Sequence, residues 1–238
     1  MAQHRIRFGI DAPNLVLGFA VGGPLLLLAS FAPFLDPLQW LVWTMRYTSF
    51  VLIAEAIFMT LSSLCGKRFV ARRMLASLDL RGNEQVLDVG CGRGLLLLEA
   101  AHQLPQGQAT GLDLWSTRDQ SGNAAAMTSR NAELAGVAER VQIDTGDMRK
   151  MPYDDACFDI IISSLAIHNL PTAADREQAV REIARVLKPG GRVALLDFRS
   201  TGEYARTLRD SGLVNVRRSW PIFMMFPWVW IVRAQRTD

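Results

Sequence analysis

The pattern of hydrophobic and polar positions divides the chain into two regions. Residues 14–35 carry no charged side chain, and a second apolar stretch runs from about residue 38 to residue 64. At about 1.5 Å per residue, a helix of either length can cross a hydrocarbon core of roughly 30 Å. From Phe69 onward, short aliphatic runs alternate with segments of helical period. The pattern predicts a hydrophobic helical hairpin over residues 1–66, which we expect to span a membrane, and an α/β domain over residues 67–238.

Within the second region, predicted strands and helices alternate along the chain. Such alternation predicts a doubly wound, mainly parallel sheet of seven strands. The strands are expected at 86–89, 109–114, 140–145, 156–163, 192–198, 214–219 and 228–234, and the helices at 69–80, 95–101, 120–135, 175–187 and 203–211. The KPGG run at 188–191 is expected to lie between helix and strand.

Aromatic and basic residues flank the apolar stretches. Lys67 and Arg68 follow the second stretch, arginines precede the first, and the turn between the two holds no basic residue. By the positive-inside rule, both termini then face the cytoplasm. Helices that lie on the membrane or cover the domain remain alternatives, and Arg46 and Glu55 inside the second stretch favour them slightly. Pro33 argues against a cleaved signal peptide. A homo-oligomer formed through these helices is left open.

Composition argues against a zinc-binding, a disulfide-rich or a nucleic-acid-binding protein. The three cysteines are isolated, which predicts neither a zinc site nor a disulfide framework, and no metal is expected. A formal net charge of +3 does not indicate a nucleic-acid partner.

A glycine turn follows the first predicted strand of the α/β domain. The run QVLDVGCGRG, residues 85–94, places glycines at every second position, and helix formers follow it. Glycine permits unusual φ values and a close approach of the backbone to a ligand. A dinucleotide fingerprint needs a third glycine where Leu95 stands. The charge of Asp88 suits an ammonium group better than a phosphate.

Two further residues follow the second predicted strand. Asp113 can accept hydrogen bonds from both hydroxyls of a ribose, although a solvated loop aspartate is the plain alternative. Trp115 can lie against an adenine face or be an ordinary aromatic of the core or surface.

Four pieces of sequence together resemble class I S-adenosylmethionine-dependent methyltransferases, nearest to the ubiquinone and menaquinone enzymes. They are the glycine turn, the GDM run at 146–148, MPYDDACFDIIIS and RVLKPGGRVALLDF. Tyr153 and Cys157 depart from the family pattern, as does GLDLWSTRDQSGN. The resemblance implies a Rossmann-like methyltransferase fold with S-adenosylmethionine as cofactor. The expected cofactor-binding residues are Asp88, Gly90, Cys91, Gly92, Gly94, Asp113, Leu114, Trp115, Asn123, Gly146, Asp147, Met148 and Ser164, with Asp147 facing the adenine amino group.

Methyl transfer to a hydroxyl or an acidic carbon needs a base. His168, just past the fourth strand, is the candidate, although it equally fits a turn cap with Asn169. The resemblance does not extend to the amino-group methylases of DNA or to arsenite methyltransferases. The apolar tail, residues 221–232, is expected to complete the sheet, line an acceptor pocket or touch lipid.

The sequence thus predicts a methyltransferase acting on a small, lipophilic acceptor at the cytoplasmic face of a membrane. Two alternatives remain. One is methylation of a soluble thiol, chalcogen or metabolite, with the hairpin used for assembly. The other is a partner protein that binds S-adenosylmethionine without turnover.

Overall fold

The computed structural model describes residues 12–32, 37–116 and 124–238. These residues divide into two compact units. The hairpin unit comprises Gly9–Lys67 together with Met224–Phe226, and the α/β unit comprises Arg68–Phe223 with Pro227–Asp238.

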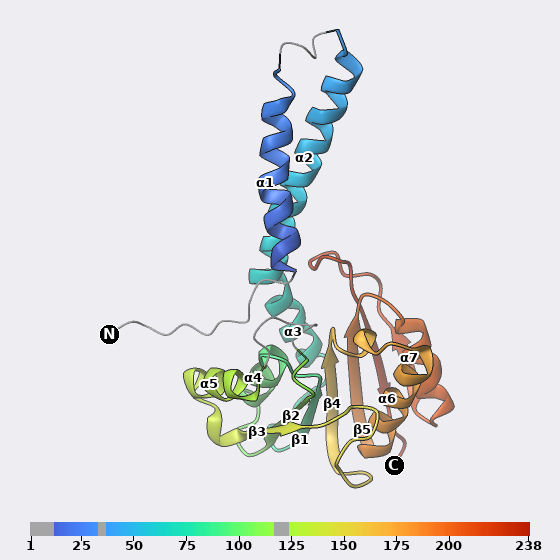
Figure 1. The fold of residues 1–238 in the computed structure, drawn as a ribbon. Coiled ribbons are helices and arrows are strands. Elements are labelled where there is room, and N and C mark those ends of the chain that lie inside the picture. The colour runs from blue at the N-terminus through green and yellow to red at the C-terminus, as the bar shows by residue number, and fades with distance from the viewer. Residues whose placement is uncertain (1–11, 33–36, 117–123) are drawn as a thin grey trace. The chain divides into compact units, whose positions relative to one another are not determined.

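The hairpin unit is built from two antiparallel helices (Figure 1). Helix α1 covers Pro13–Ala29 and α2 covers Gln39–Leu61. A π-helical turn, Ser62–Gly66, joins α2 to α3, Lys67–Ala76, so that Gln39–Ala76 forms one helix. Within the described residues this is the one helix long and apolar enough to cross a membrane. Helix α1, with 17 residues, is shorter than the predicted stretch 14–35.

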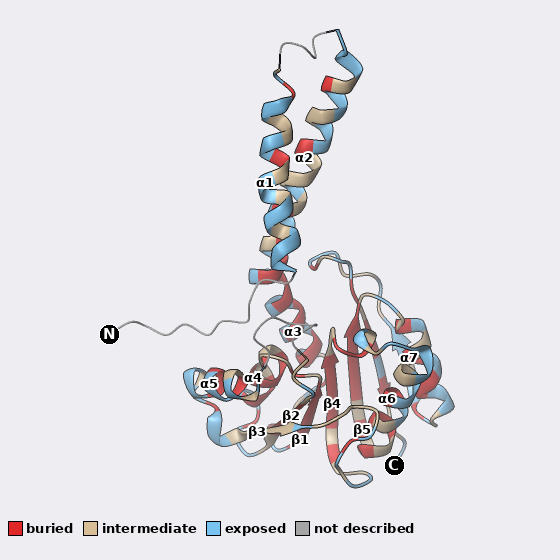
Figure 2. Cartoon of the chain, viewed as in Figure 1, coloured by how far each residue is buried: buried red, intermediate tan, exposed pale blue. Residues whose placement is uncertain are grey.

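Small side chains bring α1 and α2 together. The Ser49 hydroxyl donates to the Gly23 carbonyl at 2.7 Å, and a Cβ on Gly23 would lie 2.8 Å from Ile53 Cγ1. Many large apolar side chains of the two helices stay exposed, including Leu28 at 68% and Phe50 at 71% (Figure 2). The hairpin therefore presents many large apolar side chains on its exterior.

The α/β unit contains the predicted seven-stranded sheet. The strands are β1 Gln85–Val89, β2 Gln108–Asp113, β3 Val141–Thr145, β4 Phe158–Ser164, β5 Leu187–Asp197, β6 Val214–Arg218 and β7 Trp230–Gln235. Their order is β3-β2-β1-β4-β5-β7-β6. β7 runs antiparallel to its neighbours β5 and β6, and the other pairs are parallel.

The helices of this unit are α4 Leu95–Ala101, α5 Ala125–Ala135, α6 Ala173–Val186 and α7 Thr201–Asp210. From β1 the chain winds outward to β3 and then, after a reversal, outward through β4 and β5. Right-handed crossovers in the two directions place their helices on opposite faces, which makes the sheet doubly wound. Ligands of such sheets bind at the carboxyl ends of the strands beside the reversal, here β1 and β4.

In the α/β unit, three element boundaries differ from the predicted ones by more than two residues. Helix α3 ends at Ala76, four residues before the expected end at Leu80. The helix expected from Gln120 begins at Ala125. The KPGG run belongs to β5: Gly190 adopts φ +71°, and its N–H donates to the Arg236 carbonyl at 3.1 Å. The register of β5 against β4 shifts here, between Phe158 and Ile160. This irregularity lets β5 include a proline and two glycines, which are uncommon inside strands.

Candidate active site

The glycine turn lies between β1 and α4 and is fixed by the neighbouring strand. The N–H of Gly90 donates to the Leu112 carbonyl at 2.7 Å, and Cys91 N–H donates to the same oxygen at 3.2 Å. Gly90, Gly92 and Gly94 all have positive φ, at 74°, 49° and 82°. A Cβ on Gly90 would lie 2.2 Å from the Ala166 side chain. This position therefore excludes any side chain on both conformational and steric grounds.

Asp113, at the end of β2, holds the turn from the other side. Its Oδ2 accepts the Gly92 N–H at 2.8 Å, and its Oδ1 accepts the Trp115 N–H at 2.6 Å. The aspartate thus stands beside the glycine turn with its carboxylate already oriented.

Asp88, near the end of β1, is 1% exposed. Neither of its carboxylate oxygens has a hydrogen-bond partner among the described residues. Burial raises the pKa of Asp88 to about 8; the backbone N–H of Leu97 opposes this rise and the negative charge of Asp113 adds to it. A buried carboxylate without a partner is costly, and a cation bound beside it would relieve that cost.

Helix α5 also supports the turn, through two residues that were not predicted to do so. The Thr128 hydroxyl donates to the Gly92 carbonyl at 2.6 Å, and Asn131 Nδ2 donates to the Arg93 carbonyl at 3.0 Å. Thr128 and Asn131 are almost fully buried. A buried polar residue on the inner face of a helix was the signal available, but its partner cannot be read from the sequence.

Four predicted residues lie around the ends of β2 and β3. Trp115 has φ 60°, and its indole N–H donates to Thr145 Oγ1 at 2.8 Å. Gly146 N–H donates to the Asp113 carbonyl at 3.1 Å. Leu114 is 54% exposed, while Met148 packs partly buried against the main core. Asn123, also predicted, lies outside the described residues.

Asp147 follows β3 and is engaged by a neighbouring arginine. The Arg149 guanidinium lies 2.6 Å from Asp147 Oδ2 and also pairs with Asp175 at 2.8 Å. This hydrogen-bonded arginine lowers the pKa of Asp147. Asp147 is therefore an oriented carboxylate whose negative charge is paired with Arg149. The family resemblance did not indicate this partner.

His168 lies in a short 3-10 turn, Ile167–Asn169, after β4. Its Nδ1 lies 2.8 Å from Oδ1 of Asp197, the last residue of β5. The other oxygen of Asp197 accepts the Tyr204 hydroxyl at 3.1 Å, and both Asp197 and Tyr204 are 1% exposed. The His168 side chain keeps 12% exposure. The structure thus places a buried carboxylate against the His168 side chain, where it can orient the ring. If His168 only capped a turn with Asn169, no such carboxylate would be needed.

Ser164 ends β4, two residues before Ala166, which faces Gly90 across the turn. The described site residues therefore gather at the carboxyl ends of β1 to β4, in and just after the crossing connections. Together the fold and this geometry are those of a doubly wound α/β domain with carboxyl groups gathered at the carboxyl ends of its central strands.

Comparison with known proteins narrows this class. Residues 87–195 match the family described as "Methyltransferase domain". The chain is 34% identical over 128 residues to the 27-O-demethylrifamycin SV methyltransferase of Amycolatopsis mediterranei, over 53% of this chain and 43% of that protein. It is 30% identical over 129 residues to the demethylmenaquinone methyltransferase of Lactobacillus johnsonii, over 53% of this chain and 48% of that protein. The matches thus cover less than half of the length of these two relatives.

Solved structures agree on the fold. The YcgJ protein from Bacillus subtilis superposes with a TM-score of 0.58 at 18% identity, over 71% of this chain and 99% of that chain. Residues 87–195 are therefore similar to methyltransferase domains that use S-adenosylmethionine as cofactor.

The residues of this site fit that cofactor. S-Adenosylmethionine carries a ribose with free hydroxyls, an ammonium group and a sulfonium, and no phosphate. Asp113 offers acceptors to a ribose, and the unpartnered, buried Asp88 fits a cation. A Cβ would fill the turn at Gly90, where the cofactor of this class would need room.

Proposed function

We propose that this protein transfers a methyl group from S-adenosylmethionine to a small, lipophilic acceptor at the cytoplasmic face of a membrane. Residues 1–66 would anchor the chain and residues 67–238 would catalyse the reaction. The observation that carries the proposal is the apolar helical hairpin joined directly to a methyltransferase domain. An acceptor that partitions into lipid would be concentrated where the hairpin holds the enzyme.

The charge pattern of the long helix supports a membrane span. Arg46 and Lys67 enclose 20 residues in which Glu55 is the one charged side chain. At about 1.5 Å per residue these residues extend about 30 Å, the thickness of a hydrocarbon core. Arg46 lies 4.7 Å from the Phe31 ring, a cation–π contact within the hairpin unit. Such a pairing suits an arginine at a membrane interface.

We propose that the cofactor is held by the predicted residues of the turn and strand ends. Asp88 would neutralise the ammonium group, Asp113 would bind the ribose, and Asp147 with the Met148 amide would bind the adenine. The cofactor supplies an electrophilic methyl group on a sulfonium. The other predicted cofactor-binding residues would line the same pocket, and they stay predictions. They are Gly90, Cys91, Gly92, Gly94, Leu114, Trp115, Asn123, Gly146 and Ser164.

We further propose that His168 is the base that accepts the acceptor's proton. Asp197 facing Nδ1 favours the tautomer with its proton on that nitrogen, which leaves the lone pair on Nε2. Tyr204 holds the second oxygen of Asp197, so the carboxylate cannot turn away. A base is useful for a hydroxyl or an acidic carbon and unnecessary for a thiolate. The arrangement therefore favours oxygen or carbon acceptors over soluble thiols.

Labelled methyl transfer tests the reaction and the acceptor together. The full chain in its own membranes is incubated with S-adenosylmethionine labelled on the methyl group, with either lipid extract or aqueous extract. We expect label in the organic-soluble product fraction. Label confined to the aqueous fraction would establish a soluble acceptor instead, and cofactor binding by calorimetry without any transfer would establish a binding protein.

Alkaline carbonate extraction tests the membrane hairpin. A spanning chain stays in the pelleted membranes, whereas a full chain released into the supernatant would contradict the span.

The role of His168 is tested by His168→Gln, with Asp197→Asn as the variant of its positioning partner. We expect the first to lower kcat by about 10²–10⁴-fold, the usual contribution of general base catalysis. Cofactor affinity should stay within a few fold. The Asp197→Asn variant should shift the pH profile of kcat, since it replaces the carboxylate that faces Nδ1 and accepts the His168 backbone N–H. Full activity of His168→Gln would remove the base from the mechanism.

A further inference from the structure

The connection between β6 and β7 presents an unusual number of exposed apolar side chains. Trp220 is 90% exposed, Phe223 55%, Met224 46% and Trp228 52%. We name residues 219–229 the β6–β7 loop. Large exposed apolar groups that cluster in this way mark an interaction surface.

The β6–β7 loop has a defined conformation. Ile222 and Val229 form an antiparallel bridge, with N–H···O distances of 2.8 and 3.3 Å. Phe223 and Trp228, which follow and precede this bridge, make an edge-to-face ring pair at 4.8 Å. The Phe223 and Trp228 side chains are therefore held together by a closed turn, and they are preorganised before they meet a partner.

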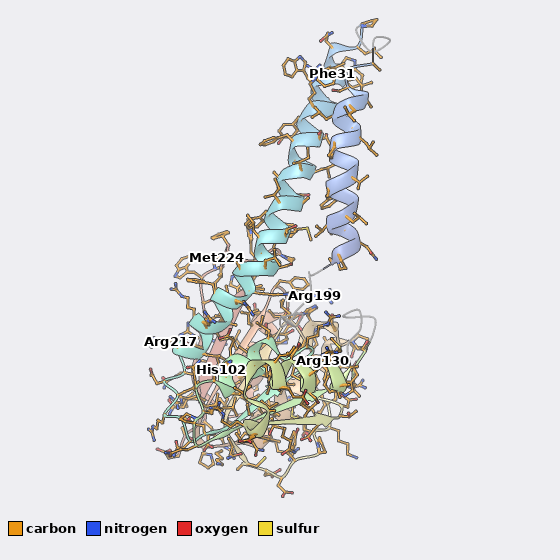
Figure 3. All side chains as sticks on the ribbon, turned by 90° about the vertical axis from the view of Figure 1, so that its left-hand side faces the viewer. Phe31, His102, Arg130, Arg199, Arg217 and Met224 are labelled. Atoms are coloured by element: carbon orange, nitrogen blue, oxygen red, sulfur yellow. The ribbon has the colours of Figure 1, made fainter. Side chains whose placement is uncertain are left out.

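The tip of the loop, Met224–Phe226, belongs to the hairpin unit. The Phe226 N–H donates to Ser62 Oγ at 2.9 Å, and the Phe226 ring packs edge-to-face on Phe58 at 6.0 Å. At Gly66 a Cβ would lie 2.1 Å from the Met224 carbonyl oxygen, so only glycine leaves room for the tip. Figure 3 labels Met224 beside the long helix, Gln39–Ala76.

The helix residues that contact the loop tip lie at one end of the apolar stretch of the long helix, Gln39–Ala76. Ser62 and Gly66 form the ends of the π-helical turn, immediately before Lys67. They therefore lie at the end of the 20-residue apolar stretch that Arg46 opens. Extra residues in a helical turn often accompany a functional contact.

Aromatic residues are distributed unevenly along that stretch. At its Arg46 end, α2 exposes Trp40 at 70%, Trp43 at 66% and Tyr47 at 72%. At its Lys67 end, residues 59–66 contain no aromatic side chain. Membrane helices carry tryptophan and tyrosine at both interfaces, so one aromatic belt is missing from the helix itself.

The β6–β7 loop can supply the missing belt. Trp220 lies four positions before Met224, and Trp228 lies two positions after Phe226. Since a residue spans at most about 3.6 Å, both tryptophans stay within about 15 Å of the docked tip. Arg217 and Arg218 of β6 are exposed and precede the loop directly, which suits anionic headgroups.

We propose that the β6–β7 loop inserts Trp220, Phe223 and Trp228 into the interfacial layer of the phospholipid bilayer, on the side marked by Lys67. The loop would be a second membrane contact, contributed by the catalytic sequence and not by the hairpin helices. The inference rests on the proposed membrane hairpin, and the experiment below separates the two.

Quenching of tryptophan fluorescence by brominated lipid tests the proposal on the full chain. The chain is reconstituted into bilayers of phosphatidylcholine with phosphatidylglycerol, brominated either near the headgroup or near the bilayer centre. We expect Trp220→Phe and Trp228→Phe each to remove part of the emission quenched by the shallow bromines. Trp230→Phe is the matched control, because the Arg218 guanidinium lies 4.6 Å over that ring. It should leave the emission quenched by the shallow bromines unchanged. Trp43→Phe reports the hairpin.

The outcomes distinguish the two ideas. Quenching that depends on Trp43 but not on Trp220 or Trp228 would overturn the loop proposal and leave the hairpin intact. Absence of quenching at all three positions would contradict the membrane placement as a whole. Blue-shifted emission from Trp220 without quenching would mean that protein, such as a second copy of this chain, covers the loop, and would equally overturn the proposal. As a second measurement, Ser62→Ala should reduce the shallow quenching, because it removes the acceptor of the Phe226 N–H.

Discussion

Replacing Asp88 with asparagine tests the electrostatics of the site directly. Burial raises the pKa of this carboxyl to about 8, whereas an unfolded chain gives an aspartate a pKa of about 3.9. Between these values the folded state binds the proton and the unfolded state has lost it. The free energy of unfolding of the wild type therefore falls as the pH rises through this window, and the loss is complete only above pH 8.

The size of the effect follows from the width of the window. Each pH unit inside it changes the stability by about 1.36 kcal/mol, so the step from pH 5 to pH 7 costs the wild type about 3 kcal/mol through this group alone. Asparagine does not titrate. Its buried amide carries a fixed cost of about 1–3 kcal/mol when unpaired, which is the same at both pH values. The stability difference between Asp88→Asn and wild type should therefore shift by about 3 kcal/mol in favour of the variant from pH 5 to pH 7.

Denaturant unfolding of the full chain in detergent, followed by near-ultraviolet circular dichroism at the two pH values, measures this shift. In thermal melts, it corresponds to roughly 6–12 °C in the difference between Tm values, at about 2–4 °C per kcal/mol for a chain of this size. A difference between variant and wild type that stays constant with pH would refute the reasoning, because Asp88 would then titrate alike in both states.

The cofactor provides the complementary measurement. A cation beside Asp88 favours its ionised form, so the wild type should bind S-adenosylmethionine more tightly as the pH rises towards 8 and should release a proton on binding below that pH. Calorimetry in buffers of different ionisation enthalpy detects the proton, and Asp88→Asn should release none through this group.

Three further predictions use matched variants. Gly90→Ala places a methyl group 2.2 Å from the nearest side-chain carbon and should abolish cofactor binding. Gly136→Ala has a similar positive φ but open space, and should cost only the backbone strain of about 1–2 kcal/mol. Asp113→Asn should weaken cofactor binding by about 10–100-fold in calorimetry, since hydrogen bonds to charged groups contribute about 1.5–3 kcal/mol; unchanged affinity would exclude it from the ribose site. Gly23→Leu should lower the thermal stability of the hairpin in far-ultraviolet circular dichroism, because its Cβ would lie 2.8 Å from the facing helix, whereas Gly22→Leu, with open space, should not.

Local patterns were sufficient to predict the α/β fold and the glycine turn. The run around Gly90 encodes strand, turn and helix within ten residues, and Asp113 stands at the end of the next strand. The sequence could not place Asp197 against His168, because 29 positions separate them and only the pairing of β4 with β5 brings them close. An acidic residue ending a buried strand was the available signal.

Other features depend on contacts that have no local signature. Arg149, in the turn after β3, engages Asp147 two positions away and also Asp175 of α6, a pairing that depends on how α6 packs against the sheet. In the sequence, the π-helical turn Ser62–Gly66 cannot be told from an ordinary α-helix. The close approach of the Met224 carbonyl to Gly66, which accompanies it, is visible only in the fold. Secondary structure follows from periodicity, whereas these arrangements require the assembled fold.

The position of Trp230 has one more consequence. This first residue of β7 stands opposite Asp197 in the strand register, and it follows Trp228 by two positions. Two positions of backbone therefore separate Trp228 from the residue that pairs with Asp197. A change in the conformation of the loop would act directly on the strand that holds Asp197 in place, as well as on β6, into which the other end of the loop continues.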